Sequence, residues 1–152
     1  LVYFDALKRR DPGCRGVISA TRGNHGQSVG FAARLHGLPA TIVVPHGNSV
    51  EKNAAMRAFG VELIEHGEDF QAARERATVL AEQRGLHMVP AFHDDLVRGV
   101  ASYWLEFFDA VQPDAVLVPS GQGSGICACA AARARTGART RIVGVVSAHA
   151  TA

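Results

Sequence analysis

The 152-residue sequence has few cysteines and no long apolar run. Its three cysteines, Cys14, Cys127 and Cys129, match no metal-ligand spacing, and their odd number suits reduced thiols better than a disulfide framework. No stretch approaches the roughly 18 consecutive apolar residues of a membrane-spanning helix, and nothing resembles a signal peptide. These absences predict a cytoplasmic protein with no membrane partner.

A strong excess of charge of one sign is also missing. Lysine and arginine together number 16 against 14 acidic residues, which gives a net charge of +2. A nucleic-acid surface needs a basic face that carries more of the charge than this. A local arginine group fits the solvated end of a helix and its loop better: Arg133, Arg135, Arg139 and Arg141. We therefore expect no nucleic-acid partner.

Short apolar runs alternate with longer amphipathic stretches along most of the sequence, whose 47% hydrophobic content is enough for a core. The patterns predict strands at 17–19, 40–44, 62–65, 87–89 and 115–119, a further strand ending at 145, and helices at 1–10, 28–36, 49–59, 69–84, 96–108 and 126–135. The expected helix C-caps are Gly37, Gly60 and Gly85. This alternation predicts an α/β fold of parallel sheets with helices on both faces.

Several polar residues have a structural interpretation that competes with a chemical one. Asn48 or Ser49 is the expected N-cap of helix 49–59, and Lys52 and Asn53 are interpreted as residues on that helix's surface. The run 93–95, His-Asp-Asp, is interpreted as a helix start capped by Asp94 or Asp95, and no metal site is expected there. Trp104 is expected in the core, and the 115–119 strand is expected to be of the buried type.

The first stretch with a chemical pattern runs from Ser19 to Gln27, between a short apolar run and a helix. A strand that passes through small, polar and glycine residues into a helix leaves backbone N–H groups unpaired at the positive end of the helix dipole. That arrangement can hold an anion, and Thr21 and Asn24 could position the turn and bind the ligand. From spacing alone, the same residues could equally be ordinary turn and N-cap residues.

The segment 23–27, Gly-Asn-His-Gly-Gln, resembles the Ser-x-Gly-Asn-His-Gly asparagine loop of the pyridoxal-phosphate-dependent threonine and serine dehydratases. These enzymes belong to the tryptophan-synthase-β-like, fold type II superfamily. The resemblance implies that Asn24 contacts the 3′-oxygen of the cofactor. It also implies that Thr21, Asn24, His25 and Gly26 bind the substrate carboxylate.

A second glycine-rich stretch, 120–125, follows the apolar run 115–119 and precedes a helix of small residues. Alternate glycines expose consecutive N–H groups, so the stretch could hold a phosphate. A nucleotide site is less well supported, because a Walker lysine and the acidic residue expected about 20 residues further on are both missing. By position this stretch resembles the tetraglycine loop of the same family, from which Gln122 and Ser124 depart. The implied phosphate-binding residues are Gly121, Gln122, Gly123, Ser124 and Gly125.

The resemblance covers essentially the whole chain and implies two three-layer α/β domains that are incomplete here. Residues 16–95 would form a small asparagine-loop domain, and residues 1–15 and 96–152 would be parts of the larger, cofactor-phosphate-binding domain. The lysine that forms the Schiff base with the cofactor is expected before Leu1, and Lys8 and Lys52 are expected to be solvated. The chain alone is therefore expected to bind the cofactor weakly and to catalyse nothing.

The implied activity is that of an ammonia-lyase, or dehydratase, which converts L-threonine or L-serine to a 2-oxo acid and ammonia, in a homo-oligomer. Arg22 stands where the serine racemases have a catalytic serine, which disfavours a racemase. Val146 and Ser147 stand where a metal-binding Glu is common, which disfavours metal activation. Two alternatives stay open: a β-replacement enzyme of the cysteine synthase type, which usually has Thr at the place of His25, and a non-catalytic domain that binds a phosphate-bearing metabolite.

Overall fold

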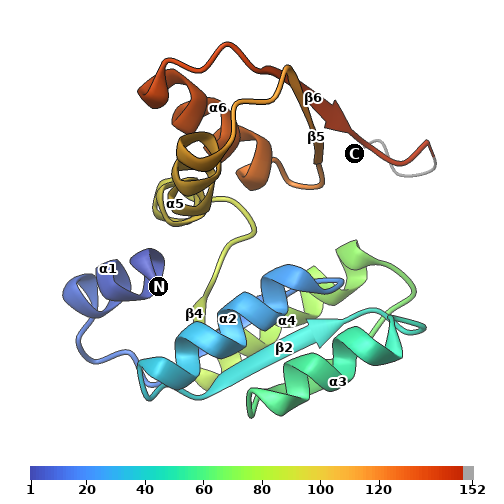
Figure 1. Cartoon of the computed structure of the whole chain (residues 1–152). Helices are drawn as coiled ribbons and strands as arrows, with labels where there is room; N and C mark the ends of the chain where they lie inside the picture. Colours follow the sequence, from blue (N-terminus) through green and yellow to red (C-terminus); the bar gives the residue numbers. More distant parts are fainter. Residues whose placement is uncertain (149–152) are drawn as a thin grey trace. The chain divides into compact units, whose positions relative to one another are not determined.

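The computed structural model describes residues 1–148, which separate into two units, one ending at Ala91 and one beginning at Phe92 (Figure 1). The first unit contains α1 (Val2–Arg10), β1 (Val17–Ala20), α2 (Asn24–Leu35), β2 (Ala40–Val44), α3 (Val50–Ala58), β3 (Glu62–Glu65), α4 (Phe70–Arg84) and β4 (His87–Met88). The second contains α5 (Asp94–Ala110), β5 (Ala115–Pro119), α6 (Ser124–Thr136) and β6 (Arg141–Val145). The predicted alternation of strands and helices is confirmed.

The sheet of the first unit is parallel, with the strand order β3-β2-β1-β4. Ile18 pairs with Thr41, and Ser19 pairs with Ile42. Parallel strands have their carboxyl ends at one edge of the sheet, so the segments that follow β1 and β2 begin at the same edge. The starts of α2 and α3 therefore lie at that edge.

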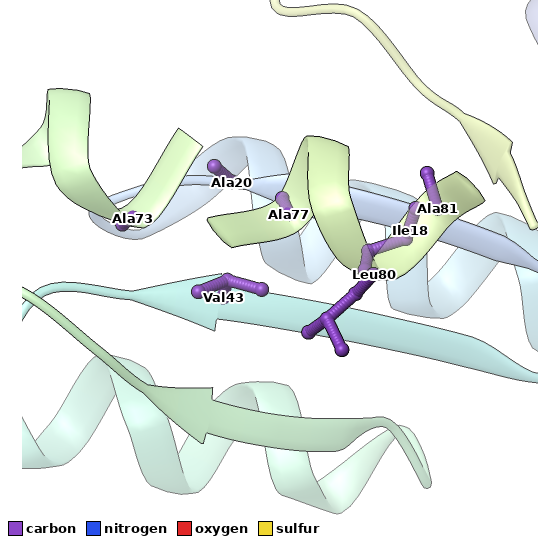
Figure 2. Close-up of a cluster of buried hydrophobic side chains, with 7 residues drawn as sticks. All are labelled: Ile18, Ala20, Val43, Ala73, Ala77, Leu80 and Ala81. Carbon is purple, nitrogen blue, oxygen red and sulfur yellow. The ribbon is translucent and has the colours of Figure 1, made fainter. Parts of the chain in front are cut away.

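Helices cover both faces of this sheet, as the sequence predicts. Every residue of β1 and β2 is buried, which explains why these strands show no polar alternation. On one face α4 packs against the strands (Figure 2): the buried cluster contains Ile18, Ala20, Val43, Ala73, Ala77, Leu80 and Ala81. On the other face α2 packs beside α3 and contacts β1 and β2.

Helix α1 packs within the first unit. The Tyr3 hydroxyl is 2.8 Å from His87 Nε2, and the Phe4 ring stacks on His36 with ring centroids 5.7 Å apart. The assignment of residues 1–15, together with 96–152, to a larger domain of the complete protein stays a prediction.

The second unit is built on one face of a two-stranded parallel sheet, in which β5 pairs with β6. Its core is formed by Trp104 and Phe108 of α5, Val116 and Val118 of β5, and small residues of α6. The expected core position of Trp104 is confirmed. The expected buried-type strand is wrong, because burial alternates along β5 and Leu117 is 71% exposed. Within residues 92–148, α5 and α6 cover only the face that carries Val116 and Val118.

Several helix ends differ from the predictions. Helices α2 and α6 begin at Asn24 and Ser124, because the polar and glycine residues after each strand turn directly into a helix. The N-cap of α5 is His93, whose Nδ1 accepts the N–H of Asp95 at 3.1 Å, and not Asp94 or Asp95. Ser49 caps α3, and all three predicted C-cap glycines have positive φ. In the described part of the chain, no helix combines the length and apolar composition needed to cross a membrane.

Candidate functional site

The turn between β1 and α2 is held by Thr21. Its backbone N–H donates to Val43 O at 3.1 Å, and its Oγ1 accepts the N–H of Gly23 at 3.0 Å. Thr21 is buried, and three residues link the strand to the helix. The Thr21 side chain thus shapes this loop, and its hydroxyl hydrogen is still able to donate.

Three successive N–H groups of this loop have no acceptor among the residues that the structure describes. They belong to Asn24, His25 and Gly26, the first turn of α2, and Gln27 is the first residue to donate back to Gly23 O. The helix has no side-chain N-cap bond and no acidic residue in its first turn. Unpaired N–H groups at the positive end of a helix dipole favour the binding of an anion. The residues predicted to bind the carboxylate therefore lie together in a place that suits one. The Asn24 side chain is exposed beside them.

His25 carries a buried ring nitrogen, Nε2, that has no hydrogen-bond partner within residues 1–148. Burial lowers the pKa of His25 because removal from water penalises the charged ring. A buried polar atom without a partner is uncommon in folded proteins and points to a ligand or a bound water. The imidazole is therefore expected to be neutral near pH 7, with one ring nitrogen free to bond a ligand.

The depressed pKa of His25 predicts a pH-dependent stability. The free energy of unfolding should keep its full value above the unfolded-state pKa of about 6.5. It should fall as the pH drops below this value, because the unfolded chain then binds a proton that the folded chain does not. Urea unfolding at several pH values measures this. His25→Gln should flatten the dependence, because it removes the titrating ring. Equal slopes in the parent and in His25→Gln would contradict this interpretation.

Gly26 lies where α2 packs against α3 and β2. A Cβ at this position would collide with Met56 Sδ and with Thr21 Cγ2, and would lie 3.3 Å from Ile42 Cγ2. Overpacking of a buried position typically costs about 1–3 kcal/mol. Gly26→Ala should therefore lower the free energy of unfolding by about this amount in chemical denaturation. Gly125→Ala is the matched control, since a Cβ there meets nothing within 4 Å, and equal losses in both variants would be the contrary result.

The prediction that Lys52 and Asn53 are both surface residues of α3 is only partly confirmed. Asn53 is buried, and its Oδ1 accepts from the Asn48 side-chain amide at 2.6 Å, so the surface prediction is wrong for it. Lys52 is exposed, but its side chain lies over Gly23 of the loop. Sequence reasoning missed this contact, although the shared sheet edge of α2 and α3 was a usable signal.

The second loop joins β5 to α6 in the same way. The Ser120 N–H donates to Val145 O at 2.8 Å, which extends the β5–β6 pairing into the loop. Gly123 is the N-cap of α6 at φ +94°, a conformation that favours glycine. In the described chain the N–H groups of Ser124, Gly125 and Ile126 have no acceptor, and Cys127 is the first to donate back, to Gly123 O. The Ile126 N–H was missed by the sequence reasoning.

The glycines of the second loop are not required by packing within the described residues. A Cβ built at Gly121, Gly123 or Gly125 meets no other atom within 4 Å. At Gly26, by contrast, a Cβ would collide with Met56 and Thr21, and at Gly23 it would meet the flexible end of the Lys52 side chain. The open side of the second loop lets a ligand approach the backbone, and its unpaired N–H groups suit a phosphate.

The chain has curated relatives along most of its length. Over 150 residues it is 38% identical to an L-threonine ammonia-lyase of Geobacter sulfurreducens, a match that covers 97% of this chain and 37% of that protein. Over 136 residues it is 35% identical to a mitochondrial threonine dehydratase of Saccharomyces cerevisiae, covering 86% of this chain and 24% of that protein. The chain therefore spans between about a quarter and somewhat more than a third of the length of these two relatives.

Solved structures share the fold. A threonine deaminase isoform of Solanum lycopersicum matches 99% of this chain and 44% of its own, with a TM-score of 0.81 and 30% identity. A pyridoxal 5′-phosphate-dependent aspartate racemase matches 94% of this chain and 44% of its own, with a TM-score of 0.86 and 25% identity. Residues 1–152 also match the family described as "Pyridoxal-phosphate dependent enzyme". This chain belongs to that family of pyridoxal-phosphate-dependent enzymes, with the fold type II architecture.

Proposed function

We propose that this chain is part of a cytoplasmic, homo-oligomeric ammonia-lyase that converts L-threonine, or L-serine, to a 2-oxo acid and ammonia. The observation that carries the proposal is the loop at the start of α2, where three unpaired N–H groups of Asn24, His25 and Gly26 lie beside the Asn24 side chain. A second loop of the same construction follows about 100 residues later, at Gly123. The curated relatives, one named an L-threonine ammonia-lyase and one a threonine dehydratase, support the substrate class.

The residues at the start of α6 fit the phosphate of the cofactor. The N–H groups of Ser124, Gly125 and Ile126 would bind its oxygens, and the Ser124 hydroxyl adds a donor. Gly121 and Gln122 would shape the loop, and the left-handed conformation of Gly123 turns the chain into α6. When bound, pyridoxal phosphate supplies an electron sink that makes the Cα–H bond of an amino acid acidic.

The residues at the start of α2 fit the carboxylate of the amino acid. Backbone N–H groups in a helix first turn are held in place, so they orient a carboxylate with little loss of entropy on binding. The Thr21 hydroxyl can donate to the same group, and the His25 ring has one nitrogen without a partner that could bond the ligand. Asn24 would direct its amide toward the 3′-oxygen that the cofactor ring carries.

The test uses the full-length protein supplied with pyridoxal phosphate. The proposal expects release of 2-oxobutanoate and ammonia from L-threonine, or of pyruvate from L-serine, together with an absorption band of the bound cofactor. Turnover of O-acetyl-L-serine with sulfide, and none of the two hydroxy amino acids, would instead support β-replacement. Binding of phosphate compounds without a cofactor band would support the non-catalytic alternative.

A further inference from the structure

Lys52 lies against Gly23, the N-cap residue of α2, although the two residues are far apart in the sequence. It comes from the first turn of α3, where its backbone N–H donates to the Ser49 Oγ cap at 3.3 Å. The next residue, Asn53, is buried and bonded to Asn48. The helical turn that carries Lys52 is thus held by its own backbone bond to Ser49 and by the side-chain bond between Asn48 and Asn53.

Glycine at position 23 makes room for this lysine. A Cβ built there would collide with Lys52 Cδ and would lie 3.1 Å from both Cε and Nζ. The methylene chain therefore crosses Gly23 and brings the ammonium beside the N-cap residue of α2. The three unpaired N–H groups begin at the following residue, Asn24.

The positive charge at this place is not balanced by the protein within residues 1–148. Lys52 makes no ion pair with a described carboxylate, and the first turn of α2 has no acidic residue. The ammonium and the positive end of the helix dipole therefore add to one another. The partnerless Nε2 of His25, in the same turn, independently indicates that a polar ligand completes this region.

We propose that Lys52 is a specificity-determining residue, whose ammonium gives the α2 loop its preference for the carboxylate of the amino-acid substrate. The inference rests on the proposed function, since it assigns the charge selectivity of that same site. A purely structural role would use only the methylene chain of Lys52, as a cover for Gly23. The two roles predict different results when the charge is removed and the chain length is kept.

The experiment compares Lys52→Met, Lys52→Arg and the parent as full-length holoenzymes, with Lys8→Met as a control that removes a positive charge from the exposed end of α1. The measurements are kcat and KM for L-threonine, and the inhibition constants of L-2-aminobutyrate and of its carboxamide. Both inhibitors lack the β-hydroxyl, and only the first carries a negative charge. The ratio of the two inhibition constants therefore measures recognition of the carboxylate independently of turnover.

Lys52→Met should raise KM and the inhibition constant of the carboxylate about tenfold, which corresponds to loss of one charge-assisted contact. The inhibition constant of the carboxamide should equal that of the parent, and kcat should change less than about threefold. Added salt should narrow the difference in KM between the parent and Lys52→Met, because it screens the charge of the lysine. Lys52→Arg should recover most of the loss, and Lys8→Met should match the parent.

Equal weakening of both inhibitors would overturn the proposal in favour of packing by the methylene chain. An active parent with an unchanged Lys52→Met variant would overturn the proposal while leaving the proposed function intact. A parent that neither turns over the hydroxy amino acids nor binds the inhibitors would overturn the proposed function, and this inference with it.

Discussion

Asn24→Ala in the full-length protein is expected to lower kcat for L-threonine about 100-fold, a loss typical for removal of one positioned donor from an active site. Asn24 is exposed in the first turn of α2 and has no partner among the described residues, so its amide is free to contact the cofactor ring. The phosphate is assigned to the other loop, which joins β5 to α6. The affinity for the cofactor should therefore change less than about threefold.

The matched control for Asn24→Ala is Ser28→Ala, an exposed position one turn further along the same helix. Steady-state kinetics and a cofactor titration by absorbance measure the two effects separately. Equal turnover in Asn24→Ala and the parent would contradict the role assigned to Asn24. A loss of cofactor that parallels the loss of kcat would contradict the division of labour between the loops.

Gly123→Ala is expected to weaken cofactor binding about 5- to 30-fold. Its φ of +94° is unfavourable for a residue with a Cβ by about 1–2 kcal/mol, and relief of this strain would turn the N–H groups of Ser124, Gly125 and Ile126 away from the phosphate. The loss should be smaller for pyridoxal, which lacks the phosphate. Turnover should recover in part at saturating cofactor.

Gly137→Ala provides the control for backbone strain alone. Gly137 caps the other end of α6 at φ +70°, so alanine there meets a comparable penalty at the end of the helix opposite the loop. Titration of each variant with pyridoxal phosphate gives the comparison. If the two variants lost cofactor affinity equally, general destabilisation of α6 would explain the result, and the phosphate assignment would fail.

Sequence patterns located the strands better than the helix starts. The limits of β2, β3 and β5 match the predicted ranges, because runs of β-branched and apolar residues end at proline, glycine or polar residues. Glycine and asparagine have low helix propensity, so helix α2 was expected to begin only at Ser28. In the structure the first turn at Asn24 forms because the sheet and α3 pack against Gly26.

Contacts between distant segments could not be predicted from local patterns. Local patterning described Lys52 and Asn53 as surface residues, whereas packing buries Asn53 and places Lys52 over Gly23. The apolar run of β5 predicted a buried strand, but burial also depends on what covers each face, and Leu117 is exposed. The two glycine-rich loops were recognisable from sequence, since the strand, loop and helix that form each one are contiguous.

The most direct test of the account is a crystal structure of the full-length protein with pyridoxal phosphate and L-2-aminobutyrate. The account predicts that the phosphate oxygens accept hydrogen bonds from the N–H groups of Ser124, Gly125 and Ile126. It also predicts that the amino-acid carboxylate accepts from those of Asn24, His25 and Gly26, with the Lys52 ammonium beside it. A phosphate bound away from the start of α6, or a carboxylate bound away from the start of α2, would contradict it.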